Sequence, residues 1–337
     1  MDLAQVVLAV MWAGLTLYAL LAGADFGGGI WDLLAGRSGP GMTRRHLIER
    51  SIGPVWEANH VWLIFVLVLL WTAFSGVFAS VMSTLYIPLT LAALGIIARG
   101  TAFAFRKAAK ELWQRRLFGA AFAVSSVLTP FFMGTVAGAI ASGRVPFGLA
   151  RGNIVTSWLN PTSLLGGVLA VLVCAYLAGA YLCDDAGAAR CTELAEWFRP
   201  RALVAAVVIG VVALGGIAVL RFDAPMLFTG LTGRALPLVV ASAIFGILSL
   251  VMLWRRVHSI ARASAMLGVI AVLWGWALAQ YPVMLPPSLT YRQAAAESSV
   301  LVATLVVTAV GVALIGPSMA WLIAVQRREL RDSGERP

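Results

Sequence analysis

The sequence predicts an all-α integral membrane protein, because it combines low charge, high hydropathy and repeated apolar stretches of membrane-spanning length. Of its 337 residues, 61% are hydrophobic and 12% are charged. Soluble domains carry roughly twice that charged fraction. The mean hydropathy is +0.90. This composition excludes both an ordinary soluble protein and a disordered chain.

Nine apolar stretches are each long enough to cross a bilayer as a helix, which takes roughly 20 residues. They cover residues 3–22, 55–73, 77–98, 117–140, 163–183, 202–220, 236–254, 264–281 and 300–325. The second and third are joined by an uncharged link at Ser75–Gly76, and we expect two spans there because one helix would overshoot the bilayer about twofold. The polar breaks are too short to bury a separate core, so residues 1–337 should form a single polytopic membrane domain.

The positive residues predict the orientation, because Lys and Arg are retained on the cytoplasmic side of a membrane. With the N-terminus outside and the C-terminus inside, all but five of the 25 Lys and Arg residues fall in cytoplasmic segments. The five on the outside are Arg144, Arg151, Arg221, Arg234 and Arg292. Because the +10 net charge is spread over many loops, it indicates topology and not a nucleic-acid-binding surface.

Asp25 is the first candidate functional residue, since ionisable groups at membrane depth are costly unless they are paired or hydrated. It lies in the Gly-rich stretch 23–29 and is expected to close the first span at its C-terminal end. The helix dipole disfavours an anion there. Two interpretations stay open: a turn residue in a Gly-rich helix exit, or a functional carboxyl.

Glu57 is the second candidate. It follows Pro54, which suits a first helical position, so Glu57 is expected in an opening helical turn, where an acid is favourable by itself. Asn59 and His60 extend the polar run another turn into the membrane, and Glu57 and His60 share a helix face at i, i+3 spacing. Together with Trp56, these side chains favour a hydrated path or buried hydrogen-bond network over simple capping.

The same residues argue against a metal or haem held by this chain alone. Glu57-x-x-His60 has the spacing of a di-iron ligand pair, but the sequence has no second Glu-x-x-His and no further helix carboxylates for it. His60 is the single histidine inside a predicted span, which makes a bis-histidine haem implausible. The three cysteines form no CxxC motif.

Arg99 ends the third predicted span and has two interpretations. It either snorkels to the interface as an anchor, or it pairs with Asp25 or Glu57 and sets the proton affinity of that carboxyl. Further along, Asn160 followed by Pro161 predicts a helix N-cap with proline at the first helical position.

Three segments resemble subunit II of cytochrome bd-type quinol oxidases. They are residues 23–29 around Asp25, the run from Ile52 to Ile64 that includes Trp56 and Trp62, and residues 99–106 beginning at Arg99. Residues 159–161 and 281–286 extend the resemblance over nearly the whole chain. The Trp-acid-x-Asn-x-Val-Trp element is its most specific part.

The resemblance implies a bacterial inner-membrane protein with nine transmembrane helices, arranged as two four-helix bundles plus one peripheral helix beside a similar subunit I. It implies that subunit I holds two b haems and haem d and oxidises ubiquinol or menaquinol. This chain would then bind no haem, support assembly and contribute a cytoplasmic proton path to the O2-reducing site. The resemblance leaves open a structural quinone, a small single-helix subunit and bound membrane lipid.

Two residues depart from the family pattern: Glu57 stands where Asp is frequent, and His60 where Gln is common. The chain is also rather short for the family, and in its length it resembles the cyanide-insensitive branch.

We predict a proton path formed by Asp25, Glu57, Asn59, His60 and Arg99, with Trp56 and Trp62 in support. The alternatives are a proton-coupled secondary transporter and a purely structural scaffold for subunit I.

Overall fold

The structure, a computed structural model, describes residues 2–36, 39–108 and 111–332. Within these ranges it does not describe the side chains of residues 54, 55, 57, 58, 106–108, 112, 115, 315, 319, 320 and 322–332. The regular secondary structure of the described part is helical apart from one short hairpin. The helices are α1 (Leu3–Leu34), α2 (Gly39–Ala73), α3 (Ser75–Thr84), α4 (Tyr86–Ala108), α5 (Leu112–Ala141), α6 (Pro161–Ala188), α7 (Thr192–Asp223), α8 (Pro225–Thr232), α9 (Leu236–Trp254), α10 (His258–Gln280), α11 (Tyr291–Ala294) and α12 (Ser298–Asp332). The antiparallel strands are β1 (Val283–Leu285) and β2 (Leu289–Thr290).

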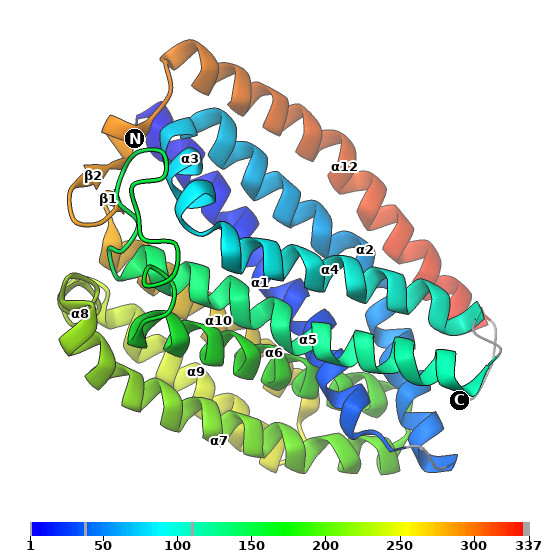
Figure 1. Ribbon diagram of the computed structural model, residues 1–337. Helices are drawn as coiled ribbons and strands as arrows, with labels where there is room; N and C mark the ends of the chain where they lie inside the picture. Colours follow the sequence, from blue (N-terminus) through cyan, green and yellow to red (C-terminus); the bar gives the residue numbers. More distant parts are fainter. Residues whose placement is uncertain (1, 37–38, 109–110, 333–337) are drawn as a thin grey trace.

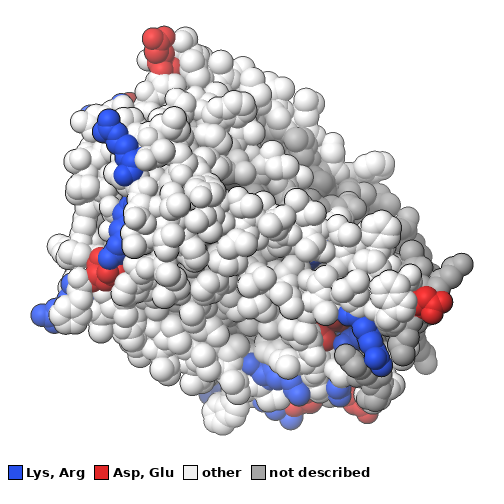
Figure 2. Space-filling view, viewed as in Figure 1, with Lys and Arg blue, Asp and Glu red and all other residues white. Residues whose placement is uncertain are grey.

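The long helices lie side by side and run between two ends of the molecule (Figure 1). One end, called here the hairpin end, carries the start of α1, the β1–β2 hairpin and α8. The other, called here the basic end, carries the start of α2 with Arg44, the start of α7 with Arg199, and the connection from α9 to α10 with Arg255, followed by Arg262 near the start of α10. Charged side chains gather toward these two ends and leave a broad uncharged belt between them on the face shown in Figure 2. Such a belt fits the hydrocarbon layer of a bilayer.

Eight of the described helices are long and apolar enough to cross a membrane, and a ninth span results if one bent pair of helical segments counts as one. That pair consists of Asn59–Ala73 and Ser75–Thr84, which meet at 118°. The predicted span at residues 236–254 coincides with α9, whereas α6, α7, α10 and α12 extend beyond the spans predicted for them. The prediction of an all-helical membrane protein is therefore confirmed.

The predicted third span, residues 77–98, starts too early in the sequence. The chain turns sharply around Phe74, forms α3, and begins α4 only at Tyr86. The reason is the packing of α3 against the loop after α5: the hydroxyl oxygens of Ser80 and Ser83 accept the backbone N–H groups of Gly148 and Ala150, each at 2.9 Å. Hydropathy alone cannot detect this corner, because α3 is as apolar as a span.

The expected positions of Asp25 and Glu57 are also wrong. Helix α1 continues to Leu34, so residues 23–29 are a helical segment and not a turn. Their glycines serve helix packing instead, since a Cβ at Gly27 would collide with the carbonyl oxygen of Cys174 in α6. Helix α2 starts at Gly39, which places position 57 well inside it and not in an opening turn. The predicted N-cap is confirmed, because the Asn160 side chain accepts the backbone N–H of Ser163.

The segment between α10 and α12 is fixed to the start of α1 at the hairpin end. The ring of Tyr281 stacks on that of Tyr291 with centroids 5.5 Å apart, and the Arg292 guanidinium donates to the Asp2 carboxylate at 2.8 Å. The backbone N–H of Gln5, together with Arg292 and Tyr291, lowers the pKa of Asp2. These contacts hold the hairpin over the end of the bundle.

Replacing Gly27 by Ala should separate α1 from α6, because the added methyl group has no space beside the Cys174 carbonyl. We expect a loss of about 1–3 kcal/mol of stability, as for other overpacked cores. Thermal melting of the purified protein measures the change. Gly210→Ala in α7 is the matched control, since nothing lies within 4 Å of its added Cβ. Equal melting temperatures for the two variants would contradict this packing argument.

Candidate functional site

The centre of the candidate site is a fully buried ion pair between Asp25 in α1 and Arg99 in α4. The Nη2 atom of Arg99 lies 2.6 Å from Asp25 Oδ1, and both side chains have 0% of their surface exposed. The same nitrogen donates to the backbone carbonyl of Asp25 at 2.6 Å. The sequence left open whether Arg99 is an interfacial anchor or a partner of a carboxyl, and the geometry makes it the partner of Asp25.

Helix α5 supplies the third polar member of the cluster. Arg99 Nη1 donates to the Ser126 hydroxyl, which in turn donates to the Phe122 carbonyl at 2.5 Å. Gly29 in α1 makes room for this arrangement, because a Cβ there would collide with Ser126 Oγ and Arg99 Nη1. The cluster therefore depends on side chains from α1, α4 and α5 meeting at one level of the bundle.

Aromatic rings close the cluster on two sides. The Arg99 guanidinium carbon lies 4.2 Å from the ring centroid of Phe122 and 5.1 Å from that of Phe26. Aromatic faces attract a cation, and the attraction grows when water is excluded. The same exclusion makes each charge of the pair depend on the other, since an isolated charge in an apolar interior costs several kcal/mol.

Asn59 in α2 connects the cluster to the polar run predicted from the sequence. Its Nδ2 atom donates to Asp25 Oδ2 at a long distance of 3.4 Å. Within the part of the chain that the structure describes, Asn59 Oδ1 and Arg99 Nε are buried and have no hydrogen-bond partner. Buried polar groups normally find a partner, and an ordered water is the usual one where protein groups are absent. The site is therefore suited to holding water beside Asp25.

Three other residues predicted for the site, His60, Trp56 and Trp62, contact their own helix or neighbouring aromatic rings. His60 Nδ1 lies 3.0 Å from the Trp56 carbonyl, so His60 bonds within its own helix, and its buried Nε2 has no partner among the described residues. Trp56 stacks on Phe103 of α4 with centroids 5.4 Å apart. Trp62 makes an edge contact with Phe65. The side chain of Glu57 lies outside the described part of the structure.

Sequence reasoning missed Ser126 and Gly29. The available signal was weak: Ser125 and Ser126 are adjacent hydroxyl residues in an otherwise apolar stretch, and Gly29 ends a run of three glycines. Thr129, one turn further along α5, is also fully buried, and its hydroxyl has no partner among the described side chains. Only the packing of α5 against α1 and α4 gives these residues a role in the cluster.

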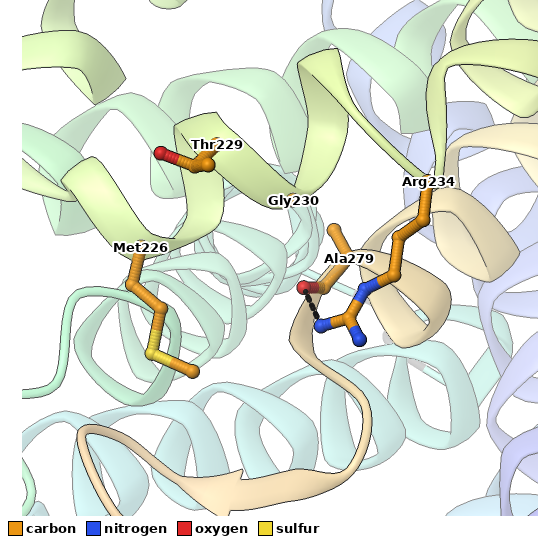
Figure 3. A pocket seen from close by; sticks show the side chains of 5 residues that line it. All are labelled: Met226, Thr229, Gly230, Arg234 and Ala279. Atoms are coloured by element: carbon orange, nitrogen blue, oxygen red, sulfur yellow. Dashed lines mark hydrogen bonds between the residues drawn. The ribbon is translucent and has the colours of Figure 1, made fainter.

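Two cavities lie away from this cluster. The first, about 520 Å³, is an open hollow between α8 and the end of α10, where the Arg234 guanidinium donates to the Ala279 carbonyl at 2.7 Å (Figure 3). The second, about 180 Å³, lies between α1, α2, α6 and α10. No histidine lines either cavity, and the described residues contain no group of three His, Cys, Asp or Glu side chains that could hold a metal.

Comparison with known proteins decides the family. The sequence matches the family described as cytochrome bd terminal oxidase subunit II over residues 3–326. This chain belongs to that family. The predicted resemblance to bd oxidases is therefore confirmed, and the alternative of a secondary transporter is not favoured.

The chain is also similar to individual bd oxidase subunits and to a solved bd oxidase structure. The chain is 33% identical over 176 residues to cytochrome bd ubiquinol oxidase subunit 2 of Bacillus subtilis, and 30% identical over 161 residues to cytochrome bd-I ubiquinol oxidase subunit 2 of Escherichia coli. These matches cover 51% and 46% of this chain, and only 50% and 41% of the respective relatives. The structure of bd oxidase from Geobacillus thermodenitrificans has the same fold, with a TM-score of 0.73, 22% identity, and coverage of 96% of this chain and 98% of that one.

Replacing Arg99 by Ala should leave the Asp25 carboxylate buried without a counter-charge. We expect a loss of about 3–5 kcal/mol, measured as reduced melting temperature and yield in detergent. The neutral double variant Asp25→Asn with Arg99→Gln should recover part of that loss, because no unpaired charge remains. Arg256→Ala is the control, since Arg256 is 65% exposed and its surface pair with Glu196 is worth about 0–1 kcal/mol. An R99A protein as stable as the control would contradict the importance of the pair.

Proposed function

We propose that this chain is the non-haem subunit II of a bacterial quinol:O2 oxidoreductase of the bd type. In this proposal it assembles in the inner membrane with a subunit I that holds two b haems and haem d and oxidises ubiquinol or menaquinol. Family membership over residues 3–326 supports the assignment. The relatives from Bacillus subtilis and Escherichia coli carry ubiquinol oxidase names, which supports quinol as the electron donor of the complex.

The proposal includes nine membrane spans within one polytopic domain, with the N-terminus periplasmic and the C-terminus cytoplasmic. The bent α2–α3 segment supplies the ninth span. Helices α1, α2, α4 and α5 would form one four-helix bundle, α6, α7, α9 and α10 the second, and α12 the peripheral helix. The position of α12 outside the other helices, against α1 and α2, supports this grouping (Figure 1). The small number of basic residues at the hairpin end supports the orientation.

The mechanistic proposal is a proton path from the basic end, with Asp25 as its buried carboxyl. Asn59 and water at the unpartnered atoms Asn59 Oδ1 and Arg99 Nε would link Asp25 to Glu57 and His60. Arg99 and Ser126 would hold the Asp25 carboxylate in a fixed orientation. The single observation that carries this proposal is the fully buried Asp25–Arg99 pair, because ionisable groups inside a membrane protein are typically retained for function.

The direction of proton flow gives this path a role in energy conversion. If quinol releases its protons at the outer side while protons for O2 reduction come from the cytoplasm, the reaction separates charge even without a pump. The path in this chain would then supply the substrate protons of a reaction that takes place in subunit I.

A second candidate role is purely structural, and one observation favours it: the charges of Asp25 and Arg99 neutralise each other within the bundle. In that case the pair would fix α1 against α4 for assembly with subunit I and carry no protons. The two roles differ in what a neutral replacement of the carboxyl does to proton uptake in a correctly assembled complex.

Glu57→Gln and the neutral double variant Asp25→Asn with Arg99→Gln, made separately, test the path, since the double variant leaves no unpaired buried charge. We expect each variant to assemble with a normal haem content and to lose O2 consumption and proton uptake in proteoliposomes by about 10²-fold, the lower range for a positioned proton-transfer group. Glu193→Gln is the control, because Glu193 is an exposed carboxyl at the same end of the bundle, in the first turn of α7. Normal uptake in both variants would contradict the path. Loss of haem with no assembled complex would indicate the structural role.

A further inference from the structure

Two arginines from different helices lie against one tryptophan ring near the basic end. The guanidinium carbon of Arg201 in α7 lies 3.7 Å from the ring centroid of Trp197, and that of Arg44 in α2 lies 4.6 Å from it. Arg201 Nη1 donates to the Trp197 carbonyl at 2.5 Å, and Arg44 Nη1 donates to the Ala35 carbonyl at 3.0 Å. All three side chains of this group, called here the arginine–tryptophan cluster, are half-buried.

The cluster carries two positive charges without a carboxylate. Neither of its arginines forms an ion pair with any residue that the structure describes, because the neighbouring acids bind other arginines. Asp32 pairs with Arg45 at 3.5 Å, and Glu196 pairs with Arg199 and Arg256, each at 2.8 Å. The two guanidiniums of the cluster are close enough for their like charges to repel each other. An anion that contacts both would remove this repulsion.

The cluster also has free hydrogen-bond donors. In each arginine Nη1 is bonded to a backbone carbonyl, whereas Nε and Nη2 make no hydrogen bond to any described residue. The planar fork of a guanidinium matches the oxygens of a phosphate, and such charge-assisted bonds are roughly twice as strong as neutral ones. A phosphate has enough oxygens to accept from two guanidiniums at once. The free donors and the unbalanced charge therefore both favour a phosphate group.

An exposed apolar stripe on α7 begins directly at this cluster. Arg201 is the last charged residue before an uninterrupted apolar run over residues 202–220. Val204, Val208 and Val211 follow Arg201 on the same face of the helix and are 63%, 39% and 64% exposed. A cationic pair followed by an exposed apolar stripe has the order of a phospholipid, in which a phosphate is followed by an acyl chain.

We propose that the arginine–tryptophan cluster binds the headgroup phosphate of an anionic phospholipid, of the phosphatidylglycerol type, and that an acyl chain of this lipid lies along Val204, Val208 and Val211. The lipid would come from the leaflet at the basic end, which is the cytoplasmic leaflet in the proposed orientation. Basic sites between transmembrane helices on that side are suited to anionic headgroups. The phosphate would link α2 to α7, which belong to different bundles in the proposed grouping.

The charge of the cluster discriminates between possible occupants. Phosphatidylethanolamine and phosphatidylcholine bring a phosphate, but they also bring an ammonium group that two unpaired guanidiniums repel. Inorganic phosphate has the required charge, but it has no acyl chain to cover the exposed valines of α7. An anionic phospholipid satisfies both the guanidiniums and the apolar stripe. The site contains neither Asp25 nor Arg99, so its occupancy can be measured independently of oxidase activity.

Native mass spectrometry of the protein, purified through a tag on this chain with its copurifying subunits, tests the proposal. After delipidation, the protein is incubated with dioleoyl phosphatidylglycerol, phosphatidylethanolamine or phosphatidylcholine in matched micelles, or with inorganic phosphate alone. We expect phosphatidylglycerol to be retained with a raised melting temperature, and about tenfold weaker retention of the other two lipids. Equal retention of all three lipids, or the same rise in melting temperature with inorganic phosphate alone, would overturn the proposal.

Two variants locate the effect at this cluster. Arg44→Gln and Arg201→Gln each remove one cation and its donors, and each should weaken phosphatidylglycerol retention about tenfold. Arg255→Gln is the matched control, because Arg255 is exposed at the same end and makes no contact with the Trp197 ring. It should retain phosphatidylglycerol as the native chain does.

The variants lie in different helices, so R44Q tests the site if R201Q fails to fold, and the reverse also holds. If neither folds, the lipid selectivity and the phosphate measurement on the native chain decide the question. Unchanged phosphatidylglycerol retention in a folded R44Q or R201Q protein would overturn the assignment to this cluster, and so would an equal loss in R255Q.

Discussion

The buried pair of Asp25 and Arg99 is the constraint on which the arrangement of the first helices depends. Two charges removed from water are tolerated when each compensates the other and hydrogen bonds satisfy most of their remaining polar atoms. Arg99 compensates Asp25 and also donates to Ser126 and a backbone carbonyl, while its Nε has no partner among the described residues. Helices α1, α4 and α5 must therefore meet at one depth and in one rotational setting.

Glycine makes that meeting possible. Gly29 leaves space for Ser126 and Arg99, and Gly27 lets α1 approach the backbone of α6. In a membrane the hydrophobic effect does not drive helices together, so close backbone approach and buried polar contacts supply much of the association. The Gly-rich stretch and the charged pair are thus parts of one packing solution: the glycines bring the helices close enough for the pair to form in a dry interior.

Two faces of α1 border different parts of the molecule. One face presents Asp25 to α4 and α5, where a buried carboxyl and adjacent unpartnered polar atoms suit proton handling. Another face, at Ala24, borders a cavity with an amphiphilic lining between α1 and α10. A single helix therefore separates a polar site inside one group of helices from a small cavity beside the other.

The sequence by itself determined the all-helical membrane character, the family and most of the candidate residues, because hydropathy, Lys and Arg placement and short motifs are properties of neighbouring positions. It also indicated Asp25 and Arg99 as unusual. It did not determine that they pair, that Ser126 and Gly29 complete the cluster, or that α3 turns by 118° from α2. Those features were decided by tertiary structure, because they arise from contacts between residues such as 25 and 99 that only helix packing brings together.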